Sequence, residues 1–577
     1  MKKPVYYFFS VLLCMMICCH EAAYSQSWQW SVPVEGGISK KGSSRAFLWI
    51  PPECKKLRGV ILAQNNMEEL SIIENKSFRD SMTTIGFGII WVSPAFDILF
   101  NVPKGSGKVF TRFIADLADS SGYHELNFVP MVPMGHSASA NFPYSFSAWF
   151  PERTLCGISV SGMYPYDFDN TFGLDTWEGR TVDDIPSLMT VGEYEGASSP
   201  NANFNKIFNR REAHPHTAVT VLPCAGEYHF ATSQKKTDFI AYYIKTAAHY
   251  RLIKDATEKS LATLKPIDPI NTGWLVDRWE KDKMPRYPLN TVAAYTGIRK
   301  ESFWCFDQEM AKRIEEYQGA YYKKIPCLLA YNQNGMQVTQ TNNHVQVTLK
   351  FIPLNDSLDF VLSSSFLDTV PAVSGRLRGW AGQPVGAKIG RPSNPELAVI
   401  DKTIGPFVRQ GYDKTSGLTT FRLMLEPGLG TVPANYKHTA IFSLAHPGDE
   451  QYKPSVLQAD MDIPVVNNGK NIQIINFPEI PNIKPNVKEI TLNATSDKGL
   501  PVQYYILEGP AVLQGNRLKL TKIPPKARYP VKVTVVALQW GRNEELAART
   551  VGMSVPLAGQ SVKTAEPVER TFYIGKH

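Results

Sequence analysis

One serine in the sequence lies in a setting that suits a nucleophile. Ser137 is the centre of the run Gly135-His136-Ser137-Ala138-Ser139, between an expected strand and an expected helix. A nucleophile on a sharp strand-to-helix turn needs small residues two positions before and after it, because the two backbones nearly touch there. Gly135 and Ser139 fill those positions, whereas a turn centred on Ser139 would place Asn141 in one of them. The spacing therefore predicts nucleophilic attack by the Ser137 hydroxyl.

Two later motifs offer an acid and a base. Val191-Gly192-Glu193-Tyr194-Glu195 ends one expected strand, and Ala225-Gly226-Glu227-Tyr228-His229 ends the next. Serine, acid and histidine in this chain order, each at the carboxyl end of a successive strand, can form a catalytic triad. We predict His229 as the general base and either Glu193 or Glu195 as the acid. His136 is expected to be a packing residue, because a neighbour on a tight turn points away from the nucleophile.

An α/β sheet is the framework that would bring these residues together. Up to about Leu264, short apolar runs alternate with helical stretches, which is typical of parallel strands joined by crossover helices. The expected strands are 59–63, 87–92, one near Phe128, 155–160, 187–191 and 217–222, and the expected helices are 72–82, 108–120 and 233–251.

Residues from about Gly59 to Arg251 resemble an α/β-hydrolase of the serine-esterase kind, through the order of these motifs. The resemblance implies that Ser137 attacks an ester carbonyl, that His229 takes its proton, and that a carboxylate orients the imidazole. In many members the acid lies three residues beyond a strand-ending glycine, which favours Glu195 over Glu193.

The resemblance also implies an oxyanion hole. One N–H would come from Ala138, and another from the loop Gln64-Asn65-Asn66 that ends the first strand, with Gln64 or Asn65 as the expected donor. The sequence departs from the family pattern in two places. Pro130 and Pro133 fall in the expected central strand, where a missing N–H disrupts pairing, and Ser139 replaces the usual glycine.

The rest of the chain divides into three segments. Residues 266–323 form an aromatic-rich connecting segment in which Trp274, Arg278 and Trp279 could line a substrate cleft, or could join the α/β domain to the later modules. Beyond Lys324, alternating runs with frequent Gly and Pro predict a β-sandwich over 324–468. Residues 469–577 resemble an immunoglobulin-like repeat of exported bacterial proteins, through the Gly499-Leu500-Pro501 turn between two expected strands.

The first residues read as an export signal rather than as part of a fold. Lys2 and Lys3 precede an apolar run, and Ala23-Tyr24-Ser25 supplies the small residues of a cleavage site. We expect a signal peptide over 1–25, a catalytic domain over 26–265, and a protein that is exported and not integral to a membrane. Lipid attachment at Cys14, Cys18 or Cys19 is the competing interpretation.

Composition limits the remaining classes of function. The chain of 577 residues is 43% hydrophobic and 20% charged, which is typical of globular domains. A net charge of +8 is too small to argue for nucleic acid as a partner. Five cysteines remain after the signal, without metal-ligand spacing, and we expect no disulfide scaffold, no metal and no organic cofactor. The five remaining cysteines are Cys54, Cys156, Cys224, Cys305 and Cys327.

Together these features predict an exported serine hydrolase that cleaves an ester through an acyl-enzyme. The expected substrate is an acetyl or methyl ester on a polysaccharide such as pectin or xylan, by analogy with other secreted enzymes built from several modules. The alternatives are a peptidase of the same fold, or a non-catalytic carbohydrate-binding or adhesion protein.

Overall fold

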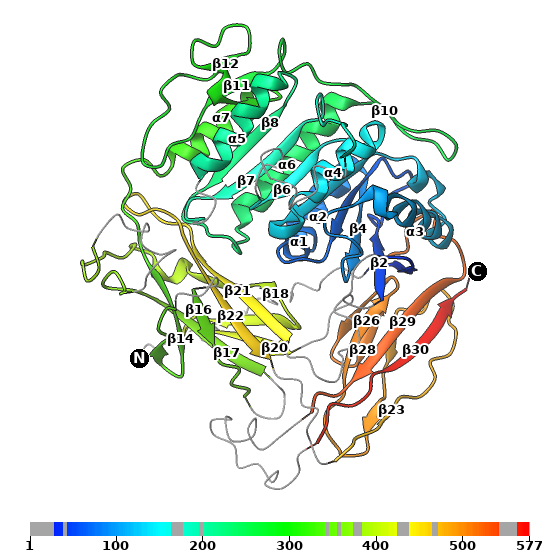
Figure 1. Ribbon diagram of the computed structural model, residues 1–577. Helices are drawn as coiled ribbons and strands as arrows, with labels where there is room; N and C mark the ends of the chain where they lie inside the picture. The colour runs from blue at the N-terminus through cyan, green and yellow to red at the C-terminus, as the bar shows by residue number, and fades with distance from the viewer. Residues whose placement is uncertain are drawn as a thin grey trace, which may run out of the picture.

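A mostly parallel sheet forms the centre of the first half of the chain in the computed structural model of the protein (Figure 1). The structure describes residues 28–37, 43–162, 177–195, 200–341, 346–354, 359–372, 384–423, 438–463, 471–541 and 562–575. The expected export signal, with Cys14, Cys18 and Cys19, lies outside these residues. From edge to edge the strands are β1 (Trp30–Val34), β2 (Ser44–Trp49), β4 (Phe87–Ser93), β3 (Gly59–Gln64), β5 (Met131–His136), β6 (Gly157–Val160), β7 (Ser187–Gly192) and β8 (Val219–Cys224).

Strands β1 and β2 are antiparallel to their neighbours, and the pairs from β4 to β8 are parallel. Parallel strands are buried on both faces, which is why β3 and β4 read as nearly continuous apolar runs. Alternate residues of β3 enter opposite cores: Ile61 and Ala63 on one face, Val60 and Leu62 on the other. The predicted α/β sheet is confirmed.

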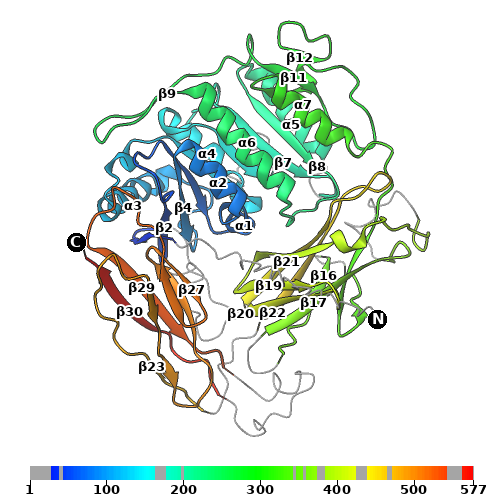
Figure 2. The same ribbon diagram turned by 180° about the vertical axis from the view of Figure 1, so that it is seen from behind.

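Helices cover both faces of this sheet (Figures 1 and 2). One face packs against α1 (Glu69–Ile73), α2 (Lys76–Ile85) and α6 (Gln234–Arg251), and the other against α3 (Ser106–Ser121) and α4 (Phe142–Trp149). Helix α5 (Pro200–Ala213) follows β7 and contributes Phe204 and Ile207 to a further apolar cluster. The single helix expected over 72–82 is two helices, because Asn75 caps the start of α2 by accepting a hydrogen bond from the Phe78 N–H at 3.3 Å.

The two prolines shift the central strand rather than abolish it. The strand expected near Phe128 begins after Pro130, at Met131. Pro133 lies inside β5, but regular pairing with β6 begins only at Met134, opposite Ile158. The missing N–H of Pro133 therefore lies before the region in which β5 pairs regularly with β6.

The aromatic-rich segment extends the α/β domain beyond β8. It forms a small sheet of β12 (Asn290–Thr291), β11 (Trp274–Asp277) and β13 (Ser302–Cys305), with helix α7 (Gln308–Gly319) packed against it. Strand β13 lies beside β8, where the Thr220 hydroxyl donates to the Trp304 carbonyl at 2.6 Å. The segment thus shares the core of the α/β domain.

A β-sandwich comes next along the chain, lying beside the loops after β7 and β8 (Figure 1). One layer orders its strands β15-β14-β17-β20-β19, and the other β16-β22-β21-β18. Their bounds are β14 (Leu329–Gln333), β15 (Met336–Gln337), β16 (Val347–Leu349), β17 (Asp359–Phe366), β18 (Val399–Ile404), β19 (Phe407–Asp413), β20 (Leu418–Leu423), β21 (His438–His446) and β22 (Ser455–Ile463). The pairs are antiparallel, except that β16 runs parallel to β22.

The C-terminal β module packs against the opposite edge of the sheet, near β2 and α3 (Figures 1 and 2). Its strands are β23 (Ile475–Asn476), β24 (Glu489–Thr491), β25 (Thr495–Ser496), β26 (Gln503–Glu508), β27 (Ala511–Gln514), β28 (Arg517–Leu520), β29 (Val531–Leu538) and β30 (Val568–Ile574). At the edge strand β1, Glu508 accepts from the Ser31 N–H at 2.9 Å, and the Gly509 N–H donates to the Trp28 carbonyl at 2.9 Å. The immunoglobulin-like assignment stays a prediction.

The five cysteines named above are all buried free thiols. Among the residues that the structure describes, no helix combines the length and the apolar character needed to cross a membrane.

Candidate active site

Ser137 lies on the turn between β5 and α4, in a left-handed backbone conformation with φ of 55°. Non-glycine residues adopt this conformation only when the surrounding structure holds them there. A Cβ at Gly135 would lie 2.0 Å from the Ser139 carbonyl oxygen, so only glycine fits. The turn therefore has the close backbone approach that the sequence predicted.

Ser139 occupies the second small position and also holds the turn. Its buried hydroxyl donates to the Glu69 carboxylate at 2.5 Å, and the same carboxylate oxygen accepts from the His136 N–H at 2.7 Å. The second Glu69 oxygen accepts from the Met67 N–H at 2.7 Å. Burial raises the pKa of Glu69, although these hydrogen bonds oppose the rise.

The structure brings Ser137, His229 and Glu195 together from the ends of β5, β8 and β7. His229 Nε2 lies 2.5 Å from the Ser137 Oγ, and its Nδ1 lies 3.4 Å from a Glu195 carboxylate oxygen. The other Glu195 oxygen accepts from the Gly192 N–H at 3.0 Å, which holds the buried carboxylate facing the imidazole. The hydroxyl can donate to Nε2 while Nδ1–H donates to Glu195.

Glu193, the alternative acid, faces away from this arrangement. Its carboxylate accepts from the Gly226 N–H at 2.9 Å and from the Lys453 ammonium of the β-sandwich at 3.1 Å. The Glu195 carboxylate instead bonds the Gly192 N–H and faces His229. The geometry therefore favours Glu195.

The expected oxyanion donor at Asn65 is wrong, because its N–H is already bonded, and the Gln64 side chain is bonded away from the site. The Asn65 N–H donates to the Val92 carbonyl at 2.8 Å, and the buried Gln64 side chain bonds the backbone of Phe96 and Asp97. Sequence could not reveal this, because these partners come from the neighbouring strand β4 and from the loop that follows it.

Asn66, the next residue, is the better candidate. Its side chain donates to the His136 carbonyl at 2.6 Å, which places it beside the turn, and no acceptor for its N–H is found among the described residues. The exposed Ala138 offers a second N–H, in the first turn of the short helix Ser137–Ser139, where backbone donors have no partner within the helix.

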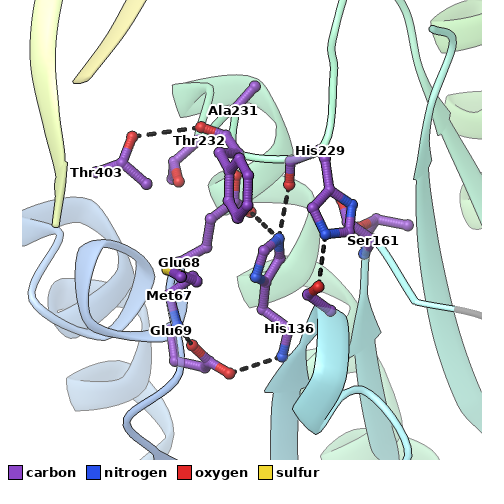
Figure 3. Close-up of polar contacts among 12 residues, drawn as sticks. Met67, Glu68, Glu69, His136, Ser161, His229, Ala231, Thr232 and Thr403 are labelled. Atoms are coloured by element: carbon purple, nitrogen blue, oxygen red, sulfur yellow. Dashed lines mark hydrogen bonds and ion pairs between the residues drawn. The ribbon is translucent and has the colours of Figure 1, made fainter. Parts of the chain in front are cut away.

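His136 is more than the packing residue that the sequence predicted. Its Nε2–H donates to the His229 backbone carbonyl at 2.6 Å, and the two rings lie 4.9 Å apart (Figure 3). Burial, and secondarily His229, hold the pKa of His136 well below 6.5, so the ring is neutral. Adjacency to the serine was the only signal in the sequence.

A buried ionic group, which the sequence did not reveal, lies behind these loops. The Lys236 ammonium is 3.1 Å from Glu68, which follows the Asn66 loop, and 3.1 Å from Glu227, on the histidine loop. All three side chains are at most 3% exposed. Burial raises the pKa of Glu68 to about 8 despite Lys236. Burial lowers the pKa of Lys236, but Glu227 and Glu68 outweigh it and the net change is a rise.

The expected substrate-binding residues lie in packing positions. Trp279 is buried in the apolar cluster that contains Phe204, and the Arg278 guanidinium lies over the Phe208 ring, 5.3 Å from its centroid. Trp274 is half-buried in β11. These contacts favour the structural alternative for Trp274, Arg278 and Trp279, because they join the segment to the α/β domain.

No family model matches the sequence, and no curated protein matches it. Solved structures are similar to part of the chain. Est1E from Butyrivibrio proteoclasticus is 13% identical, with a TM-score of 0.26, and the match covers 37% of this chain and 96% of Est1E. An S-formylglutathione hydrolase from Agrobacterium tumefaciens is 12% identical, with a TM-score of 0.29 and coverage of 39% and 96%.

A third structure, described as a truncated form of a carbohydrate esterase from gut microbiota, is 12% identical, with a TM-score of 0.27 and coverage of 40% and 98%. The strand order and the placement of three side chains identify the fold in this chain directly. A β1-β2-β4-β3-β5-β6-β7-β8 sheet that carries serine after β5, a carboxylate after β7 and histidine after β8 is the α/β-hydrolase fold.

Proposed function

We propose that this protein is a serine ester hydrolase in which Ser137, His229 and Glu195 form the catalytic triad. The observation that carries the proposal is the relay from the Ser137 hydroxyl through His229 to Glu195, with separations of 2.5 and 3.4 Å. A serine hydroxyl is a weak nucleophile at neutral pH until a positioned base removes its proton.

The reaction follows from this geometry. Ser137 Oγ attacks the ester carbonyl while His229 Nε2 takes its proton, and Glu195 stabilises the imidazolium that forms. The imidazolium then protonates the departing alcohol, which leaves an acyl group on Ser137. Water, deprotonated by the same imidazole, attacks the acyl carbon and releases the acid.

The tetrahedral intermediate needs donors for its oxyanion. The N–H groups of Ala138 and Asn66 are the proposed pair, and losing one such donor costs about 100- to 1000-fold in turnover. Fixed backbone donors are effective because they need not reorient as charge develops.

A natural substrate and a location can also be proposed. We propose that the natural substrate is an acetyl or methyl ester on a polysaccharide. We also propose that the protein is exported. The support is the amino-terminal sequence pattern and the presence of β modules beside the α/β domain, as in secreted enzymes that act on polymers.

A chromogenic acetyl ester tests the chemistry. We expect the wild-type chain to hydrolyse it and Ser137→Ala to be reduced to background, with Ser145→Ala, a buried serine on α4, as a matched control. Equal hydrolysis by wild type and Ser137→Ala would refute the triad. Acetate release from acetylated xylan and methanol release from pectin test the substrate, and failure on both would remove the polysaccharide assignment.

A further inference from the structure

The loop that carries His229 is bonded to the β-sandwich rather than to the α/β domain alone. The Val456 N–H of β22 donates to the Gly226 carbonyl at 2.9 Å. Two residues further along β22, the Gln458 side-chain oxygen accepts from the N–H of Phe230, the residue directly after His229. From β18, the Thr403 hydroxyl donates to the Phe230 carbonyl at 3.4 Å (Figure 3).

The fit between loop and sandwich is close enough to need glycine. Gly226 has φ of 66°, and a Cβ there would lie 1.9 Å from the Pro454 carbonyl oxygen. Beside it, the Lys453–Glu193 ion pair is nearly solvent-free, with side chains 2% and 1% exposed. Buried ion pairs hold their partners tightly, because separating them leaves an uncompensated charge.

The same face of the sandwich also touches the loop that supplies the proposed oxyanion donor. Ile404 and Ile441 of the sandwich cluster with Phe230, and Met67, which follows Asn66, packs against them. The sandwich therefore contacts both the histidine loop and the oxyanion loop.

We propose that the β-sandwich is a working part of the catalytic centre, with Gln458 as a positioning residue that holds the His229 loop; this rests on the proposed function. Gln458 does not touch the reacting atoms. It fixes the backbone next to the catalytic imidazole, and a misplacement of about 1 Å at a catalytic group can cost about 100-fold in rate.

The test uses full-length variants. Gln458→Met removes the acceptor and keeps the side-chain size, Gln458→Glu restores an acceptor oxygen, and Gln340→Met is the control. Gln340 is also buried in the sandwich and donates to the Leu329 carbonyl at 3.2 Å, away from the histidine loop. We measure kcat and KM on a chromogenic acetyl ester, the rate at which a fluorophosphonate labels Ser137, and the melting temperature.

We expect Gln458→Met to lower kcat and the labelling rate together by about 10- to 100-fold, with little change in KM. Gln458→Glu should recover most of the loss, and Gln340→Met should keep wild-type rates. Should Gln458→Met fail to fold, Thr403→Val, which removes the hydrogen bond to the Phe230 carbonyl, replaces it with the same expected direction.

Unchanged kcat in the folded variant, or an equal loss in Gln340→Met, overturns the proposal, because the sandwich then serves stability alone. These outcomes are distinct from failure of the proposed function. If wild-type Ser137 neither labels nor hydrolyses the ester, both proposals fall; an active wild type with a fully active Gln458→Met removes only this one.

Discussion

The buried carboxyl of Glu68 should make the stability of this protein depend on pH. Burial raises its pKa from 4.5 to about 8. Repulsion by Glu227 and Glu195 adds to the rise, and attraction by Lys236 opposes it. His136 also faces it, with Nε2 3.9 Å from a Glu68 carboxylate oxygen, and burial holds the pKa of His136 well below 6.5. Between these two pH values the folded chain holds a proton on Glu68 that the unfolded chain has lost, so the contribution of Glu68 to stability is greatest in acid and falls as pH rises toward 8.

The size of the effect follows from the two pKa values of Glu68. A pKa that differs by 1 between the folded and unfolded chain corresponds to about 1.36 kcal/mol, so a difference of about 3.5 sets an upper limit of about 5 kcal/mol for this group. At about 2 °C per kcal/mol for a domain of this size, the melting temperature would change by as much as about 10 °C. Glu68→Gln removes this contribution, because glutamine stays neutral while remaining an acceptor for Lys236.

The assay is thermal unfolding of wild type and Glu68→Gln between pH 5 and pH 8. We expect similar melting temperatures at pH 5 and a growing advantage for the variant toward pH 8. Asp80→Asn is the control, because Asp80 is exposed and pairs with Lys76 on the surface. A difference between variant and wild type that stays constant across this range would refute the reasoning.

The geometry of the site supports three further predictions. Glu195→Gln should lower kcat by about 10⁴-fold, whereas Glu193→Gln, which keeps an acceptor oxygen, should lower kcat by less than about tenfold. Steady-state kinetics on the acetyl ester measures both losses. A larger loss in Glu193→Gln than in Glu195→Gln would contradict the assignment. His136→Phe should lower kcat by about tenfold, because the hydrogen bond to the histidine loop is lost. The midpoint of the acid limb of the pH–rate profile should not move, because the pKa of His136 lies well below 6.5. A shifted midpoint would show that His136 titrates in this range. Gly226→Ala should lower both kcat and the melting temperature. Gly515 has a similar φ of 61° but open space where a Cβ would lie, so Gly515→Ala should cost only the backbone strain of about 1 kcal/mol. Equal losses in the two variants would show that the close approach at Gly226 is unimportant.

Features that depend on neighbours along the chain are the ones that the sequence predicts well. The apolar periodicity over 108–120 predicts helix α3, and the glycines at the ends of β7 and β8 mark the loops that carry Glu195 and His229. The order of three motifs, each tied to a strand end, predicts that Ser137, His229 and one of Glu193 and Glu195 lie on one edge of the sheet.

Pairing across long separations is not predicted by the sequence. Lys453 meets Glu193 across 260 positions, and Lys236 meets Glu68 across 168. A buried lysine looks like a surface lysine in a sequence, because nothing in the local pattern reports a carboxylate that arrives from another segment. The same holds for Asn65, whose N–H is taken by a neighbouring strand.

The outer edge of the sheet bears on how this protein avoids self-association. Strand β1 has only one partner strand among the described residues, and a bare edge of this kind is a template for pairing with another molecule. The C-terminal module occupies that edge, with Glu508 on the Ser31 N–H and Gly509 on the Trp28 carbonyl. A shortened chain that ends before this module would leave the edge uncovered and tend to aggregate. The module therefore covers the edge at which a second molecule could otherwise pair with the sheet.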